Sequence, residues 1–280
     1  MASIFFMEHC VSCRGFDQDL TASRSIGVAL RVDPRRKARR EQIDGQGTGI
    51  WYRSAIWVLM WVLVCGWTSE SVYAQSPLDH DLRLWSPVYL TMQLPSSFLG
   101  TMEVHPRFGE HVSELHQLVV RPVLGYQLTD HWSIWQGYTW VGTYRPRFAE
   151  EHHSIQQLIY RRKFPSFELF SRFMLEERVI GGADGTGVRA RTLMRVDVPL
   201  PQAPEWAVVL YNEVLVNVNS VRNGPQEGFD ENRFVAGMNR QVTEEISVDF
   251  GYQMQVQNRA SSGLVNQMNH ILLVQFFINL

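Results

Sequence analysis

The chain has 280 residues, a formal net charge of −2 and a mean hydropathy of −0.16. Its acidic and basic residues nearly balance, which excludes a protein that binds nucleic acid through a basic surface. Residues 75–280 contain no apolar run of roughly 18 residues, which excludes a helical membrane span in that part of the chain.

Residues 1–53 differ in composition from everything that follows. A run of basic residues lies between Arg35 and Arg40, and no hydrophobic period is sustained. An ordinary secretory signal begins close to its apolar core, whereas here a long segment precedes that core. We expect residues 1–53 to be an N-terminal extension that is either disordered or not translated.

Residues 54–74 have the organisation of a secretory signal peptide. Arg53 precedes the apolar stretch 55–67, and Val72 and Ala74 occupy the small-residue positions of a cleavage site. The alternative is an uncleaved membrane anchor, but a helix that spans a bilayer needs about 20 apolar residues. We expect residues 75–280 to be exported, and this part of the chain contains no cysteine.

The C-terminal segment alternates as a β-strand does. Because strand side chains point to opposite faces in turn, one face of this segment is wholly apolar and the other is mixed. The apolar face consists of Leu272, Val274, Phe276, Ile278 and Leu280. An apolar closing strand is typical of bacterial outer-membrane barrels. We therefore predict that the last four of these residues direct membrane assembly, with outer-membrane lipid and the barrel assembly machinery as partners.

The same alternation recurs along the rest of the exported chain. It occupies residues 82–94, 98–108, 115–128, 132–145, 153–164, 167–179, 188–198, 206–218, 232–240, 244–256 and 270–280. A helical period of 3.6 residues would break these runs within two turns. The sequence therefore predicts an all-β fold over 75–280, an antiparallel up-and-down transmembrane β-barrel of about 10–12 strands. Eleven runs conflict with the even number found in bacterial barrels, so we expect ten or twelve strands.

The connections between these runs alternate in length. Short segments such as 128–132 and 164–167 alternate with segments such as 180–187 and 217–233, which are longer and richer in Gly, Asn and charge. Bacterial outer-membrane barrels have short periplasmic turns and longer outer loops. The alternation is therefore evidence for an up-and-down barrel with two unlike ends.

Alternation alone does not decide which face is outside, because a soluble barrel has an apolar interior. The export signal, the length of the runs and the apolar last strand favour an inverted barrel with its apolar face in lipid. An arginine on the lipid face at mid-membrane costs about 2–4 kcal/mol, so the strand arginines are predicted to face the lumen. These are Arg83, Arg189, Arg191 and Arg195. A soluble periplasmic barrel or sandwich is the alternative.

Many aromatic residues lie toward the ends of the predicted strands. They are Trp85, Tyr89, Trp132, Trp135, Tyr138, Trp140, Tyr144, Trp206 and Tyr211. Aromatic girdles mark both interfaces of membrane barrels, so we predict that these residues form them. Packing within the barrel is the alternative for any one of them.

Four segments carry a resemblance to a known family. They are LRLWSPVYL, GYQLTDHWSIWQGYTWVGTY, the loop NSVRNGPQEGFDENR and the final NHILLVQFFINL. In these segments the chain resembles a bacterial family of uncharacterised outer-membrane barrel proteins, classed as a domain of unknown function. The resemblance covers about residues 80–280 and implies a location and a fold, with no catalytic motif. Leu280 departs from the aromatic residue with which many such barrels end.

A group of charged residues is predicted to meet inside the barrel. If 167–179 and 188–198 form a hairpin, their inward charges oppose one another across the connecting loop. The predicted patch consists of Glu176, Arg178, Arg189, Arg191 and Arg195. It is either a selectivity or binding patch, or a structural ion-pair network, because small barrels fill their interiors with side chains.

Other candidate chemistry is weak. Glu151, His152 and His153 resemble half of a metal site, but two adjacent strand residues point opposite ways, and we expect an outer loop here. No G-x-S-x-G motif is present, and no Ser–His set is distinguished from chance. The sequence indicates no cofactor, no metal and no identifiable small-molecule ligand. It predicts an integral outer-membrane barrel with a narrow polar lumen in a structural, binding or limited transport role. The alternatives are a lipid-modifying hydrolase and a soluble periplasmic binding barrel.

Overall fold

The computed structural model describes residues 78–144, 146–259 and 266–280. The predicted extension, the predicted signal peptide and all three cysteines lie outside these ranges. The strands are β1 (Leu78–Trp85), β2 (Val88–Gln93), β3 (Phe98–Gly109), β4 (Glu114–Gln127), β5 (Trp132–Thr143), β6 (Ala149–Lys163), β7 (Glu168–Ile180), β8 (Thr186–Leu200), β9 (Ala203–Asn217), β10 (Gly228–Gln241), β11 (Ile246–Gln257) and β12 (Asn266–Asn279). Within the described ranges, no helix is long and apolar enough to cross a membrane.

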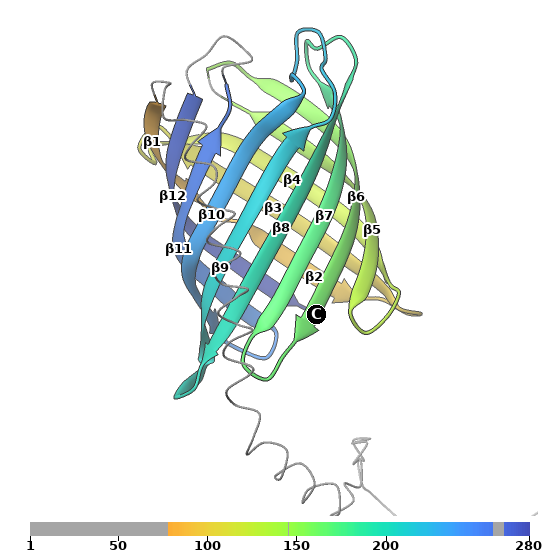
Figure 1. The fold of residues 1–280 in the computed structure, drawn as a ribbon, viewed down its shortest axis with the longest axis vertical. Helices are drawn as coiled ribbons and strands as arrows, with labels where there is room; N and C mark the ends of the chain where they lie inside the picture. Colours follow the sequence, from red (N-terminus) through yellow and green to blue (C-terminus); the bar gives the residue numbers. More distant parts are fainter. Residues whose placement is uncertain (1–77, 145, 260–265) are drawn as a thin grey trace, which may run out of the picture. The chain divides into compact units, whose positions relative to one another are not determined.

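The strands form one sheet that closes into a barrel (Figure 1). From β3 to β12 each strand pairs antiparallel with the next along the chain. Strands β1 and β2 share one position in the wall, since both pair with β12 in the same register: Trp85 lies opposite Leu273, and Val88 opposite Phe276. Only Ser86 and Pro87 separate them, and a proline has no N–H to donate to a ladder. Twelve strands thus occupy eleven positions.

The barrel closes with a parallel pair. In a ring of eleven positions the first and last strands run in the same direction, and β12 pairs in parallel with both β1 and β2. The amide of Phe276 donates to the Pro87 carbonyl at 2.8 Å, and that of Leu280 donates to Thr91 at 2.8 Å. A parallel ladder satisfies the edge groups as an antiparallel one does. The expectation of an even number is therefore wrong, whereas the eleven alternating runs are confirmed.

The two ends of the barrel differ. At one end the connections are residues 94–97, 128–131, 164–167, 201–202 and 242–245; at the other they are 110–113, 144–148, 181–185, 218–227 and 258–265. The alternation of short and longer connections is therefore confirmed. Because the closing strands are parallel, β1 begins at the end with long connections, whereas the chain ends at Leu280 at the end with short turns (Figure 1).

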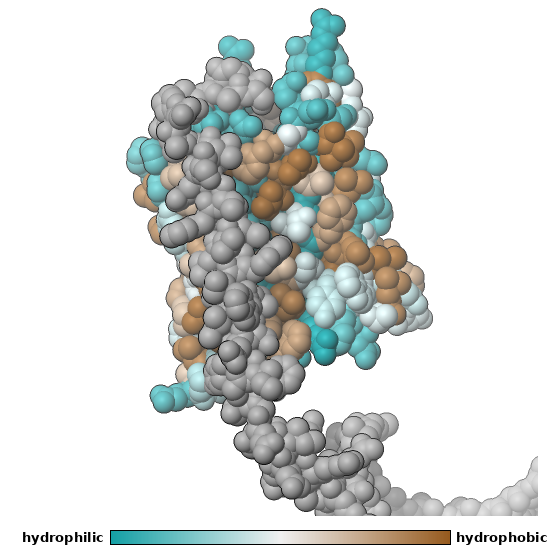
Figure 2. Space-filling model, in the orientation of Figure 1, coloured by the Kyte–Doolittle hydropathy of each residue, from teal (hydrophilic) through white to brown (hydrophobic). Residues whose placement is uncertain are grey.

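The outer face of the wall is apolar and the inner face is polar. On β11, Phe250 is 40% exposed and Tyr252 41% exposed, whereas the alternating Asp249 and Gln253 are only 4% and 2% exposed. Hydrophobic side chains cover much of the wall that Figure 2 leaves visible, and hydrophilic ones gather around the long connections. The two faces are therefore arranged as predicted, with the apolar side outside and the polar side inside, which is the reverse of a soluble barrel.

Four of the aromatic residues predicted for girdles point into the barrel instead. Trp85 is 5% exposed and Tyr211 7% exposed, and Tyr89 stacks on the inward Phe277 with ring centroids 4.9 Å apart. Trp135 packs against an inner cluster that contains Ile155. The girdle prediction is wrong for these four residues because all of them lie at inward positions of their strands. None of them is on the outer face, however close it lies to a strand end.

Candidate functional site

Most of the charge patch predicted from the sequence borders a single cavity. Four of its residues line a hollow of about 720 Å³ in the half of the barrel nearer the long connections, namely Glu176, Arg178, Arg189 and Arg191. The hairpin of β7 and β8 brings them together, since Glu176 lies directly opposite Arg189 in the ladder. The four residues therefore belong to one site.

Arg195 belongs to a different layer. Its guanidinium lies 2.8 Å from Asp197 on its own strand and 2.5 Å from Asp249 on β11. Asn239 on β10 donates a further hydrogen bond of 2.7 Å to Asp249. This group lies nearer the short turns and lines neither of the described hollows. Arg195 thus crosslinks the wall and does not line the cavity.

Glu176 is the centre of the ion pairs on one side of the cavity. Its side chain has no exposed surface, and its oxygens lie 2.7 Å from both Arg189 and Arg191. Arg121 on β4 approaches it at 3.9 Å and pairs more closely with Glu103, at 2.9 Å. A buried carboxylate is tolerated only when opposite charges and hydrogen bonds surround it. Glu176 meets that condition with three arginines.

Glu213 has the same role on the other side. This β9 carboxylate lies 2.6 Å from Arg191, 2.9 Å from Arg172 and 3.1 Å from Arg233. Its partners come from β8, β7 and β10. Arg191 bridges Glu213 and Glu176, so the two centres form one continuous network. The network crosses the interior and holds strands that are not neighbours in the sheet.

A layer of side chains closes the barrel beneath the cavity. Trp85 belongs to an apolar cluster inside the barrel that includes Tyr211, Ile271 and Leu273. A second hollow of only about 50 Å³ lies on the other side of this layer, next to Tyr89. Trp85, Arg107, Arg121, Arg191 and Arg233 border both hollows. We call these five residues the partition.

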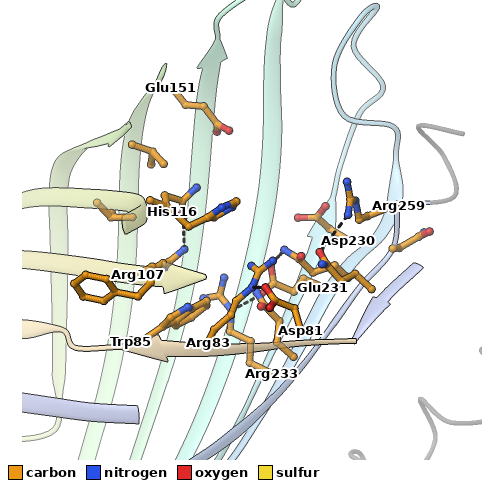
Figure 3. Close-up of a pocket in the computed structure, with 18 of the residues that line it drawn as sticks. Asp81, Arg83, Trp85, Arg107, His116, Glu151, Asp230, Glu231, Arg233 and Arg259 are labelled. Atoms are coloured by element: carbon orange, nitrogen blue, oxygen red, sulfur yellow. Dashed lines mark hydrogen bonds and ion pairs between the residues drawn. The ribbon is translucent and has the colours of Figure 1, made fainter. Parts of the chain in front are cut away.

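Arg107 and Trp85 meet at the floor of the cavity (Figure 3). The guanidinium carbon of Arg107 lies 4.0 Å from the centre of the Trp85 ring, and that of Arg233 lies 5.2 Å from it. Arg107 also donates a 2.6 Å hydrogen bond to Gln117 on β4. Cation–π contacts of this kind hold a guanidinium in place without neutralising its charge.

The mouth of the cavity lies among the long connections. Its lining includes Glu110 and His111 from the connection 110–113, and also Arg259 from 258–265. The β3–β4 ladder has a register shift between Arg107 and Phe108, with one extra residue on β4, and both Phe108 and His116 line the cavity.

The neighbouring histidines lie on a strand. Glu151, His152 and His153 belong to β6, which begins at Ala149, so the expected outer loop is wrong. His153 points inward and lies 2.9 Å from Glu151, which pairs with Arg178 at 2.8 Å. His152 points to the outer face.

In the part of the chain that the structure describes, the side-chain types needed for a metal site or for hydrolysis do not gather into such a site. Among the described residues, no group of three or more His, Cys, Asp or Glu side chains is arranged to hold a metal ion. Ser133 accepts a hydrogen bond from Trp135. His105 lies 3.2 Å from Glu103, and His270 lies on the outer face beside Tyr252.

Comparison with known proteins identifies the family. The family model described as "Protein of unknown function (DUF2490)" matches residues 82–269. The chain belongs to the DUF2490 family. An uncharacterized protein from Methylorubrum extorquens is similar to this DUF2490 chain, with 29% identity over 182 residues, which cover 63% of this chain and 78% of the relative. No solved structure matches the chain. The matched region contains the partition and most of the cavity lining.

Several residues of the site were not singled out from the sequence. Alternation did place Trp85, Glu103 and Arg107 on inward faces, but nothing indicated that they would meet at one level. Glu213 and Arg233 lie on β9 and β10, outside the hairpin from which the charge patch was predicted. Cross-barrel contacts depend on strand tilt and stagger, which the alternating pattern does not encode.

Proposed function

We propose that this protein is an integral outer-membrane β-barrel that holds a polar binding cavity at its outer end, closed below by the partition. The apolar outer face carries this proposal. Outward side chains such as Leu124, Phe173 and Leu272 are 52%, 49% and 51% exposed. Apolar burial is the main driving force of folding, so a face of this kind is stable when hydrocarbon covers it.

Exposed aromatic residues near both ends of the barrel support this membrane location. Beside the short turns, Phe98 pairs with Tyr126 and Trp132 with Tyr160, at centroid distances of 5.1 and 4.9 Å. Beside the long connections, Tyr144 and Phe148 are 37% and 60% exposed, and their ring centroids lie 5.7 Å apart. Aromatic side chains of this kind suit the interfaces between hydrocarbon and water.

The partition favours binding over open transport. A water-filled channel needs a wide lumen, whereas a barrel of about eight strands is filled by side chains, and eleven positions lie much nearer that number than the 16–18 of porins. Here Trp85 and its neighbours separate a hollow of about 720 Å³ from one of about 50 Å³. With short turns on the periplasmic side, as in bacterial barrels, the larger cavity opens outward.

Membrane fractionation of the full chain tests this proposal. We expect the protein to sediment with outer membranes, to resist extraction by salt, and to migrate faster on gels before boiling than after it. Extraction into buffer without detergent would instead support a soluble periplasmic barrel. In planar bilayers we expect no stepwise conductance from the wild-type protein; regular channel openings would contradict a closed partition.

A further inference from the structure

The ion-pair network that includes the arginines of the partition has one more positive charge than negative charge. Six arginines meet at this level: Arg107, Arg121, Arg172, Arg189, Arg191 and Arg233. The carboxylates that pair with them are Glu103, Glu176, Glu213, Asp230 and Glu231. The nearby pairs Arg178–Glu151 and Arg83–Asp81 are each neutral. The network is therefore left with one uncompensated guanidinium.

That guanidinium is Arg107. Within the described ranges, no carboxylate lies within 4.0 Å of it, whereas each of the other five arginines has one at 3.1 Å or less. A charge withdrawn from water is stable only when it is paired, so this position favours a negative group from outside the chain.

Two polar groups at the same place lack hydrogen-bond partners. The Nε of Arg107 and the Nε1 of Trp85 are both buried, and neither has a partner among the described residues. Both residues line the floor of the cavity of about 720 Å³. A buried donor without a partner costs about 1–3 kcal/mol. Unpaired charge and unpaired donors thus coincide at the closed end of a cavity that has an opening.

We propose that the cavity binds a small water-soluble oxyanion, a carboxylate or phosphate compound, with Arg107 as its charge partner. A guanidinium presents parallel N–H donors that match the oxygens of both groups. The volume lies in the range of ligand pockets, about 300–1,000 Å³. Arg259 at the mouth, which donates to Gln267 at 3.2 Å, adds positive charge along the path of entry.

This inference deepens the proposed binding role and names the chemistry of its ligand. The oxyanion site does not depend on whether the barrel lies in a membrane, because the cavity lies inside the barrel wall. A protein that proves soluble in fractionation retains the oxyanion site, and a membrane protein that binds no oxyanion disproves only the site.

The test is calorimetric titration of the purified full chain with inorganic phosphate and with succinate, at constant ionic strength in chloride. We expect saturable binding of at least one of them, and a dissociation constant at least about tenfold higher for Arg107→Gln, because a charge-assisted hydrogen bond is lost. Arg222→Gln is the matched control, since Arg222 lies in the long connection 218–227 and its side chain is 86% exposed. This control should bind as the wild type does.

Two further measurements test the same site. If Arg107→Gln fails to fold, Arg107→Lys retains the charge without the planar fork and should bind more weakly than wild type. Quenching of tryptophan fluorescence by the ligand should diminish in Trp85→Phe. Equal binding by wild type and a folded Arg107→Gln would overturn the proposal. So would a signal that appears only with vesicles containing phosphatidylglycerol, which would indicate a lipid headgroup.

Discussion

The inner and outer faces of the barrel wall alternate along every strand, so adjacent residues experience opposite surroundings. Outside, Phe250 and its neighbours present exposed apolar surface; inside, Glu176 and Glu213 are enclosed by arginines. The outer face requires only a class of side chain, because hydrocarbon or another apolar surrounding is not directional. The inner face requires particular partners, because each buried charge must be compensated. Tolerance to substitution should therefore differ between the two faces.

The largest effect is expected on the inner face. Glu213→Gln leaves Arg172, Arg191 and Arg233 without their shared carboxylate. Removal of one partner from a buried ion pair destabilises a protein by about 3–5 kcal/mol. Unfolding in urea, followed by the gel mobility of unboiled samples, measures the change. A loss below about 1 kcal/mol would mean that water enters the network freely.

A paired substitution compares the faces directly. Phe250→Arg places a charge on the outer face, where it costs about 2–4 kcal/mol at mid-membrane depth. Ser247→Arg introduces the same side chain on the same strand at an inward position, three residues away. We expect the first variant to assemble poorly and the second to assemble well, as judged by the folded fraction in outer membranes. Equal assembly of the two variants would contradict a lipid-facing outer surface.

Two glycines provide a smaller comparison. A methyl group on Gly125 would lie 2.3 Å from the Trp135 ring inside the barrel, whereas one on Gly100 would meet Leu94 on the outer face at 3.5 Å. Gly125→Ala should therefore destabilise the barrel by about 1–3 kcal/mol through overpacking. Gly100→Ala should change the free energy of unfolding little. A similar midpoint in urea for both variants would show that Trp135 moves aside without strain.

The smallest effect is expected at an exposed ion pair. Arg222 lies 3.7 Å from Asp184, and their side chains are 86% and 60% exposed. Solvent-exposed pairs contribute about 0–1 kcal/mol, so Arg222→Gln should barely move the urea midpoint that Glu213→Gln shifts strongly. A large shift would reveal a structural role for the long connections.

Part of the candidate site was predictable because alternation is local. The inward positions of Arg189 and Arg191, and their proximity to Glu176, follow from two adjacent runs joined by one loop. The separation of Arg195 from them was not predictable, since its partner Asp249 comes from β11, far along the chain. The position of Trp85 was not predictable either. Alternation placed it on the inward face, but its place at the end of a strand also suited a girdle.

The sequence by itself determined which face most strand residues occupy, the eleven runs and the unlike lengths of the two sets of connections, because these depend on a period of two and on local turn chemistry. The tertiary structure alone decided the parallel closure, the partition, the cavity and the unpaired Arg107. These depend on how tilt and stagger bring distant strands to the same level, which no local pattern records.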